Sequence, residues 1–184
     1  MIIAIISDIH DAEEKLKSAM EEIEKRYVSQ ILFLGDFVTK RIAKKLLESN
    51  IPVFGIWGNC DGNKVEITRL SMKKGSNLKM ALDTYAIIKE NKFQYSSNDK
   101  DEVEVKTDGK TIFMTHDRDL VEHMAKSNDF DAIFYGHKHE IENKVYNEKC
   151  CIVNPGAICG NWSTKKSTFA IYNTKTNSAE IIEL

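Results

Sequence analysis

Residues 131–139, with the sequence DAIFYGHKH, constrain the fold more than any other stretch of the chain. Four consecutive non-polar residues, Ala132 to Tyr135, are typical of a short strand that is buried on both faces. Gly136 ends this run, and His137 and His139 follow it directly. Open α/β sheets carry their chemistry at the carboxyl ends of their strands, so the segment predicts an α/β fold with two imidazoles near one point. Taken alone, the pair is equally consistent with two solvated loop histidines.

Four other non-polar runs also end in polar side chains. Ile2–Ile6 leads to Asp8 and His10, residues 31–34 to Asp36, residues 52–57 to Asn59, and residues 111–114 to His116. Four of the five histidines in the chain follow such runs, whereas His123 lies in a predicted helix and is expected on the surface. The coincidence predicts that seven side chains meet at one sheet edge: Asp8, His10, Asp36, Asn59, His116, His137 and His139.

Helical patterns separate the early strands. A helix is predicted over residues 12–27, with Asp11 as its N-cap and Leu16, Ala19, Met20, Ile23 and Tyr27 facing inward. Thr39 is expected to cap a second helix that buries Ile42, Ala43, Leu46 and Leu47. A third helix over residues 117–126 turns Leu120, Val121, Met124 and Ala125 inward. The sequence also predicts a short helix at 65–72, a strand at 85–88 and a loop at 96–101.

Hairpins dominate the later part of the chain. Asp108 and Gly109 are predicted to form a two-residue hairpin turn between strands 102–107 and 111–114. Residues 141–146 pair with 150–153, and residues 168–173 pair with 179–182. Early βα units followed by hairpins indicate two packed sheets with helices outside, an α/β sandwich. With 184 residues, 42% of them hydrophobic, we expect one domain over residues 1–184.

Charge and composition exclude several classes of protein. The formal net charge of -2 disfavours nucleic-acid binding by bulk electrostatics. No apolar run approaches the roughly 20 residues that a membrane span requires, so we expect no membrane partner. The four cysteines, Cys60, Cys150, Cys151 and Cys159, lack CxxC spacing, which favours a reducing, cytoplasmic location.

The seven side chains suit a pair of metal ions. Imidazole, carboxylate and amide ligands together favour manganese, iron, cobalt, nickel or zinc over calcium or magnesium. Two ions roughly 3.5 to 4 Å apart share a carboxylate naturally, lower the pKa of a bridging water and clamp phosphate oxygens. This is the chemistry of phosphoester hydrolysis. The alternative is a set of polar strand caps without metal.

The motifs DIH, GD, GNCD, TH, GHKH and NPG, in this order over nearly the whole chain, resemble those of the calcineurin-like metallophosphoesterases, most closely the small single-domain bacterial and archaeal phosphodiesterases. The resemblance implies a four-layer α-β-β-α sandwich of two mixed sheets flanked by helices. It implies that Asp8, His10, Asp36 and His139 hold one metal, that Asp36, Asn59, His116 and His137 hold the other, and that Asp36 bridges. Manganese is the first expectation for both ions, and Asn59 and His116 are the expected catalytic residues.

The chain departs from the wider superfamily at three positions. Cys60 stands where many members have a histidine, Asp117 where a glycine is common, and Ala157 where a serine is common. The missing histidine matters most, because in those relatives it contacts the substrate phosphate and is a candidate proton donor to the leaving group. Residues 64–100 match no part of the family pattern that we can place.

We therefore expect a metal-dependent phosphodiesterase for a small phosphodiester or nucleotide-like substrate, in which a bridging hydroxide attacks phosphorus in line. A protein-binding scaffold is the alternative from another class, because a retromer subunit of similar length shares the fold with a degraded metal site and a similar NPGA-x-x-G run. The intact Asp8 and His10 argue against such a loss of activity. A DNA nuclease of the same superfamily is a third possibility. Such nucleases normally have a capping domain and the GNHD histidine, neither of which this sequence shows. The oligomeric state stays open, with a homodimer as one outcome.

Overall fold

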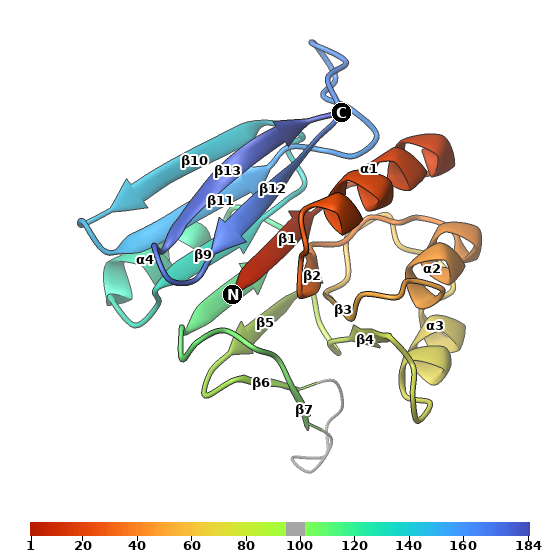
Figure 1. Cartoon of the computed structure of the whole chain (residues 1–184), viewed down its shortest axis with the longest axis horizontal. Coiled ribbons are helices and arrows are strands. Elements are labelled where there is room, and N and C mark those ends of the chain that lie inside the picture. Colours follow the sequence, from red (N-terminus) through yellow and green to blue (C-terminus); the bar gives the residue numbers. More distant parts are fainter. Residues whose placement is uncertain (95–101) are drawn as a thin grey trace.

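The computed structural model describes residues 1–94 and 102–184, which form two large mixed sheets, a two-stranded sheet and four helices (Figure 1). The first sheet has the order β13-β12-β1-β2-β3-β4, with bounds Ser178–Glu183, Thr168–Asn173, Ile2–Ile6, Gln30–Phe33, Val53–Gly55 and Leu78–Met80. The second has the order β10-β11-β9-β8-β5, with bounds Ile141–Tyr146, Cys150–Pro155, Ala132–Tyr135, Ile112–Thr115 and Tyr85–Ile88. Strands β6 (Lys92–Gln94) and β7 (Glu102–Glu104) form the small sheet.

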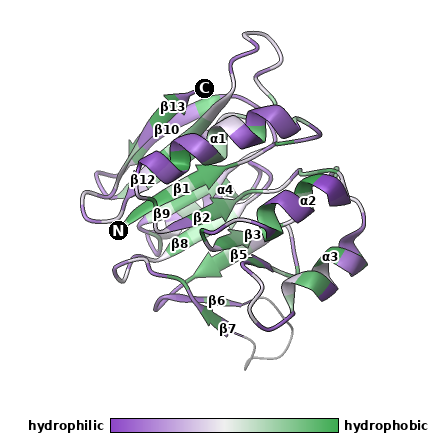
Figure 2. Cartoon of the chain, turned by 45° about the vertical axis from the view of Figure 1, so that its right-hand side comes forward, coloured by the Kyte–Doolittle hydropathy of each residue, from purple (hydrophilic) through white to green (hydrophobic). Residues whose placement is uncertain are grey.

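The helices cover the outer faces of the two large sheets. Helices α1 (Glu13–Lys25), α2 (Lys40–Leu47) and α3 (Lys64–Ser71) lie on one side of the molecule, and α4 (Val121–Ser127) lies on the other (Figure 1). Strands β1 to β4 run parallel because a helix connects each strand to the next. In Figure 2 the central strand β1 is hydrophobic, whereas α1 and α2 each show a hydrophilic side.

Alternation along the central strands divides the core into layers. On β1, Ala4 and Ile6 pack beneath the first three helices, whereas Ile3 and Ile5 pack between the two sheets. A third apolar cluster joins α4 to the outer face of the second sheet: Phe113, Val121, Ala125, Phe130, Ile133, Tyr135, Cys150 and Ile152. The predicted four-layer α-β-β-α sandwich is confirmed.

Helix ends account for several wrong predictions. Ala12, not Asp11, is the N-cap residue of α1, and the Asp11 carboxylate accepts a hydrogen bond from Thr39 Oγ1 at 2.6 Å. Thr39 does hold the N-cap position of α2, but without a side-chain cap bond. Tyr27 is 92% exposed because α1 ends at Lys25 and the left-handed Tyr27 backbone turns the chain away. Leu120 is 40% exposed because it precedes the first turn of α4.

The predicted hairpin at Asp108 and Gly109 is also wrong. Strand β7 pairs with β6, whereas β8 pairs with β5 and β9, so this turn connects two different sheets. Asn91 holds the segment before the turn, since its side-chain oxygen accepts hydrogen bonds from Thr107 N and Oγ1. The predicted strand at 52–57 is shorter in the structure, and the predicted loop at 96–101 lies outside the described residues. The strand at 85–88, the helix near 65–72 and both C-terminal hairpins are confirmed.

The two sheets place the carboxyl ends of β1, β2, β3, β8 and β9 at one edge of the sandwich. Backbone hydrogen bonds tie the loops there together: Asp8 N donates to Gly35 O at 3.0 Å, His10 N to Asp36 O at 2.9 Å, and Gly136 N to His116 O at 3.2 Å. Among the described residues, no helix is long and apolar enough to cross a membrane.

Candidate metal centre

The structure brings all seven predicted side chains together, in two clusters that share Asp36. The first cluster consists of Asp8, His10, Asp36 and His139. His139 Nε2 lies 3.2 Å from His10 Nε2 and 3.3 Å from Asp8 Oδ1, and His10 Nε2 lies 3.9 Å from Asp36 Oδ2. Side chains from three loops therefore approach one another here, and Asp8 and Asp36 also lie close to His116.

The second cluster consists of Asp36, Asn59, His116 and His137. Asn59 Oδ1 lies 2.9 Å from both His116 Nε2 and His137 Nδ1. His116 Nε2 is also 3.5 Å from Asp36 Oδ2, the same oxygen that faces His10. One carboxylate oxygen thus belongs to both clusters.

Unusual backbone conformations aim these side chains. Asp8, His10, Asp36, His137 and His139 all have positive φ, between 47° and 71°. Non-glycine residues seldom adopt this region, and such strain concentrates at functional sites.

Two glycines at the cluster loops have no room for a side chain. A Cβ atom on Gly136 would lie 2.1 Å from Ser7 Oγ, and one on Gly58 would lie 2.0 Å from Asp36 Oδ1. These glycines allow the loops to approach the carboxylates closely.

Backbone carbonyls fix the orientation of two of the imidazoles. His116 Nδ1 donates to Leu34 O at 2.7 Å, and His139 Nδ1 lies 3.3 Å from Gly160 O. When Nδ1 carries the proton, the lone pair of Nε2 points into the cluster. This arrangement is typical of histidines that bind metal ions.

One atom of the first cluster lacks a hydrogen-bond partner. Asp8 is fully buried; its Oδ2 accepts hydrogen bonds from Ser7 Oγ at 2.6 Å and His137 N at 2.9 Å, whereas Oδ1 has none. His139 Nε2 lies 3.3 Å from Oδ1 without a hydrogen bond between them, and a buried carboxylate oxygen that accepts no hydrogen bond is costly unless a cation lies beside it. The imidazole, carboxylate and amide donors around it fit divalent transition-metal ions.

The ionisation of the clusters reflects their mutual attraction. Burial opposes ionisation of Asp36, but the hydrogen bond to His116 and the charge of His116 lower the pKa of Asp36 to about 2. Burial likewise opposes a charged His139, yet Asp8 and Cys159 raise its pKa to about 10, and Asp36 and Asp8 raise the pKa of His116. The carboxylates therefore favour positive charge at both clusters, in the form of protons or of metal ions.

Sequence reasoning missed the role of Asp61, the last residue of the GNCD motif. Its carboxylate accepts hydrogen bonds from Gly58 N at 2.7 Å, Val38 N at 2.9 Å and Asp36 N at 3.1 Å. Asp61 thereby holds the Asp36 loop against the Asn59 loop. Burial raises the pKa of Asp61, opposed by these three N–H donors.

Trp162 and Cys159 were missed as well. The Trp162 indole stacks on His139, with ring centroids 4.5 Å apart and an angle of 14°, and its edge faces His10. Cys159 Sγ lies 3.6 Å from His139 Nδ1 and forms, with His10 and His139, a further group able to hold a metal ion. His123 is exposed on α4, as predicted.

This arrangement agrees with the comparison to known proteins. Residues 1–177 match the calcineurin-like phosphoesterase superfamily domain. The chain belongs to this superfamily. A curated phosphodiesterase of Methanocaldococcus jannaschii is 27% identical over 179 residues, which cover 95% of this chain and 94% of the relative.

Solved structures of the superfamily fold resemble the chain over its whole length. An archaeal phosphodiesterase superposes with a TM-score of 0.80 at 24% identity, with 100% of both chains covered. Vps29 of Chaetomium thermophilum superposes with a TM-score of 0.64 at 14% identity, covering 100% of this chain and 96% of Vps29. At these identities the likeness shows the fold, which agrees with the four layers described above.

Proposed function

We propose that this member of the superfamily is a metal-dependent phosphodiesterase with a dinuclear site, formed by one domain over residues 1–184. The observation that carries the proposal is the pair of clusters that share the Asp36 carboxylate, with a buried Asp8 oxygen in the first that accepts no hydrogen bond. The similarity to the phosphodiesterase of M. jannaschii supports the reaction class. Manganese remains our first expectation for both ions.

The chain's own residues divide into two roles in this proposal. Asp8, His10, Asp36, His116, His137 and His139 would hold the ions, together with the side-chain oxygen of Asn59. Two divalent ions bound there would lower the pKa of a water between them and neutralise charge on the phosphate oxygens. Asn59 is exposed, so its amide N–H can also donate to a phosphoryl oxygen as charge builds in the transition state. His116 is buried and held by Leu34 O, which keeps its Nε2 on the reacting side.

A small diester is the substrate class that fits Cys60. The Cys60 side chain is exposed beside Asn59, whose Nδ2 donates to Sγ at 3.2 Å. Partial desolvation and the nearby Asp36 carboxylate raise the pKa of this exposed thiol above its ordinary value, so Cys60 is neutral near pH 7. A neutral thiol supplies neither a readily transferred proton for a poor leaving group nor a charge for the extra oxygen of a monoester.

The decisive experiment compares metal-stripped and reloaded protein. Activity on bis-nitrophenyl phosphate and on nitrophenyl phosphate should disappear on chelation and return with manganese or nickel. His116→Ala should abolish the restored activity, whereas His123→Ala, which removes an exposed histidine outside both clusters, should retain it. Diester hydrolysis that survives stringent chelation would contradict the proposal.

A protein-binding scaffold is the second candidate, and the likeness to Vps29 favours it. A scaffold has no need for seven converging ligand side chains or for the strained conformations that aim them. The same experiment separates the two functions, because a scaffold would bind no diester and would show no metal-dependent turnover.

A further inference from the structure

A groove beside the second cluster offers a place for the rest of the substrate. It has a volume of about 390 Å³ and lies between α3 and the turn that joins β4 to β5. We call it the α3 groove; Trp57, Lys64, Arg69, Leu82 and Asp83 are among the residues that line it. Apart from Trp57, which lies in the loop after β3, these residues belong to the segment 64–100, which matches no part of the family pattern that we can place.

The walls of this groove support the second cluster directly. His116 N donates to Thr84 O at 2.9 Å, and Trp57 N donates to Asp83 O at 3.2 Å. Trp57 also lies only two residues before Asn59 along the chain. The α3 groove and the second cluster are therefore joined through the hydrogen bond between Thr84, which lines the groove, and His116.

The charge of the groove is positive although the chain as a whole is slightly acidic. Lys64 Nζ lies over the Trp57 ring, 5.6 Å from its centroid, and Arg69 lines the groove from the same helix. Glu66 on this helix is paired with Lys40, and among the residues that the structure describes neither Lys64 nor Arg69 has a salt-bridge partner. The one carboxylate in the lining, Asp83, accepts a hydrogen bond from its neighbour Thr84 N at 2.7 Å.

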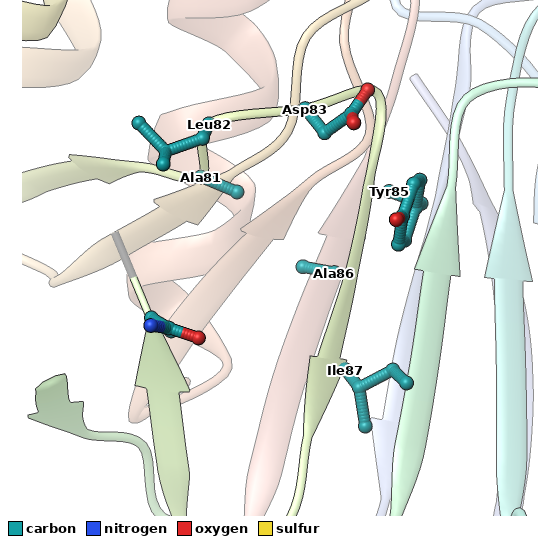
Figure 3. A pocket seen from close by; sticks show the side chains of 7 residues that line it. Ala81, Leu82, Asp83, Tyr85, Ala86 and Ile87 are labelled. Carbon is teal, nitrogen blue, oxygen red and sulfur yellow. The ribbon is translucent and has the colours of Figure 1, made fainter. Parts of the chain in front are cut away.

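Apolar side chains accompany these charges. Leu82 is 55% exposed and lines both the α3 groove and a second hollow of about 410 Å³. Figure 3 shows this second hollow: Leu82 and Asp83 come from the turn at the top of the view, and Tyr85, Ala86 and Ile87 follow down β5. Exposed apolar surface beside unpaired cations matches a ligand that has a planar or apolar body and an anionic end.

We propose that the α3 groove binds the non-scissile part of the substrate and that Lys64 and Arg69 select diesters carrying a second phosphate there, as in a nucleotide. This inference rests on the proposed phosphodiesterase function, because the scissile phosphate would occupy the two clusters. Arg and Lys are the residues that bind phosphate groups most effectively.

Binding measurements test the groove without turnover. Calorimetry on manganese-loaded protein would compare thymidine 3′,5′-bisphosphate with thymidine 5′-monophosphate. We expect the wild type to bind the bisphosphate roughly tenfold more tightly, and Lys64→Gln/Arg69→Gln to lose this preference. The control Lys73→Gln/Lys74→Gln removes two charges just beyond α3, outside the groove lining, and should keep it.

Kinetics then connect the groove to catalysis. The ratio of kcat/KM for a thymidine dinucleotide with a terminal phosphate to that for one without it should fall roughly tenfold in the double variant. In the control Lys73→Gln/Lys74→Gln this ratio should stay at the wild-type value. An absent preference in the wild type, or a preference that survives in the double variant, overturns the proposal. If no diester is hydrolysed but the binding preference holds, the phosphodiesterase function fails and the groove stands.

Discussion

The two clusters that share Asp36 differ in burial and in chemistry. In the first, Asp8 and His139 are buried and two carboxylates face the imidazoles, with Trp162 stacked against His139. In the second, Asn59 is exposed and His137 is half-buried. The Asn59 amide stands there in place of a second carboxylate. A carboxylate binds a cation more strongly than a neutral amide near solvent does. The first cluster is therefore suited to hold an ion tightly, and the second to exchange an ion and admit substrate.

The largest expected effect comes from removing what the clusters share. Asp36→Asn keeps the side-chain shape but removes the charge that both clusters use. We expect the affinity for both ions to fall by more than about 100-fold, the upper range for residues that only support metal ligands. Metal analysis after dialysis measures this loss. Retention of two ions would contradict the shared role of Asp36.

Single histidine substitutions should reveal the difference between the clusters. His10→Ala should abolish the tight binding step, whereas His137→Ala should leave that step intact and weaken the looser one. Calorimetric titration with manganese separates the two steps, and the wild type and the surface variant His123→Ala are the controls. Equal losses in both variants would show that the clusters do not act as separate sites.

Cys60 sharpens the role of the open second cluster. Cys60→His places an imidazole beside Asn59, which should raise phosphomonoester turnover by up to roughly 10²-fold through general acid catalysis. Cys60→Ala should leave the hydrolysis of activated diesters nearly unchanged. If Cys60→His binds two ions and keeps the wild-type ratio of monoester to diester turnover, Cys60 does not set the substrate class.

Asp61 holds the Asp36 loop against the Asn59 loop, and Asp61→Asn should lower the stability of the protein. Asp61→Asn replaces an ionised acceptor of three backbone hydrogen bonds with a neutral amide. We expect the free energy of unfolding to fall by about 2 kcal/mol, the usual range for hydrogen bonds to charged groups. Denaturant titration of the metal-free protein measures this fall. An unchanged midpoint would mean that the two loops are held by other contacts.

The smallest effect is spectroscopic and reports on the first cluster alone. The chain has two tryptophans, Trp57 and Trp162, so Trp57→Phe leaves Trp162 as the single fluorescent indole. Trp57 is 4% exposed. Binding of a paramagnetic ion such as manganese or nickel beside His139 should partly quench Trp162. Adding His10→Ala should remove the quenching at low metal concentrations. If quenching followed only the looser step, the tight site would be the second cluster, which contradicts the prediction that the first cluster binds its ion more tightly.

Local patterns were sufficient to predict the strands that carry the clusters. Each of these strands is a short non-polar run that ends directly in a polar side chain, and parallel strands bring such ends to one edge. The family motifs predicted how the seven residues divide between two sites, which stays a prediction, and the structure places Asp36 Oδ2 against both His10 and His116.

Other features depend on contacts between residues distant in the sequence. Strands β4 and β6 have three residues each, too few to show a period. Because β6 was not predicted as the partner of β7, the turn at Asp108 was interpreted as a hairpin. Asp61 and Trp162 act through atoms of other loops, which spacing along the chain does not encode. Tyr27 and Leu120 continue a helical period in the sequence, but α1 ends at Lys25, before Tyr27, and α4 begins at Val121, after Leu120.

The central claim, that the chain binds two divalent ions through a shared Asp36, is tested most directly by titrating metal-free protein with manganese in a calorimeter. The account predicts two ions per chain in two distinct steps, both weakened in Asp36→Asn. A single ion per chain, or two ions whose binding is unaffected by Asp36→Asn, would contradict it.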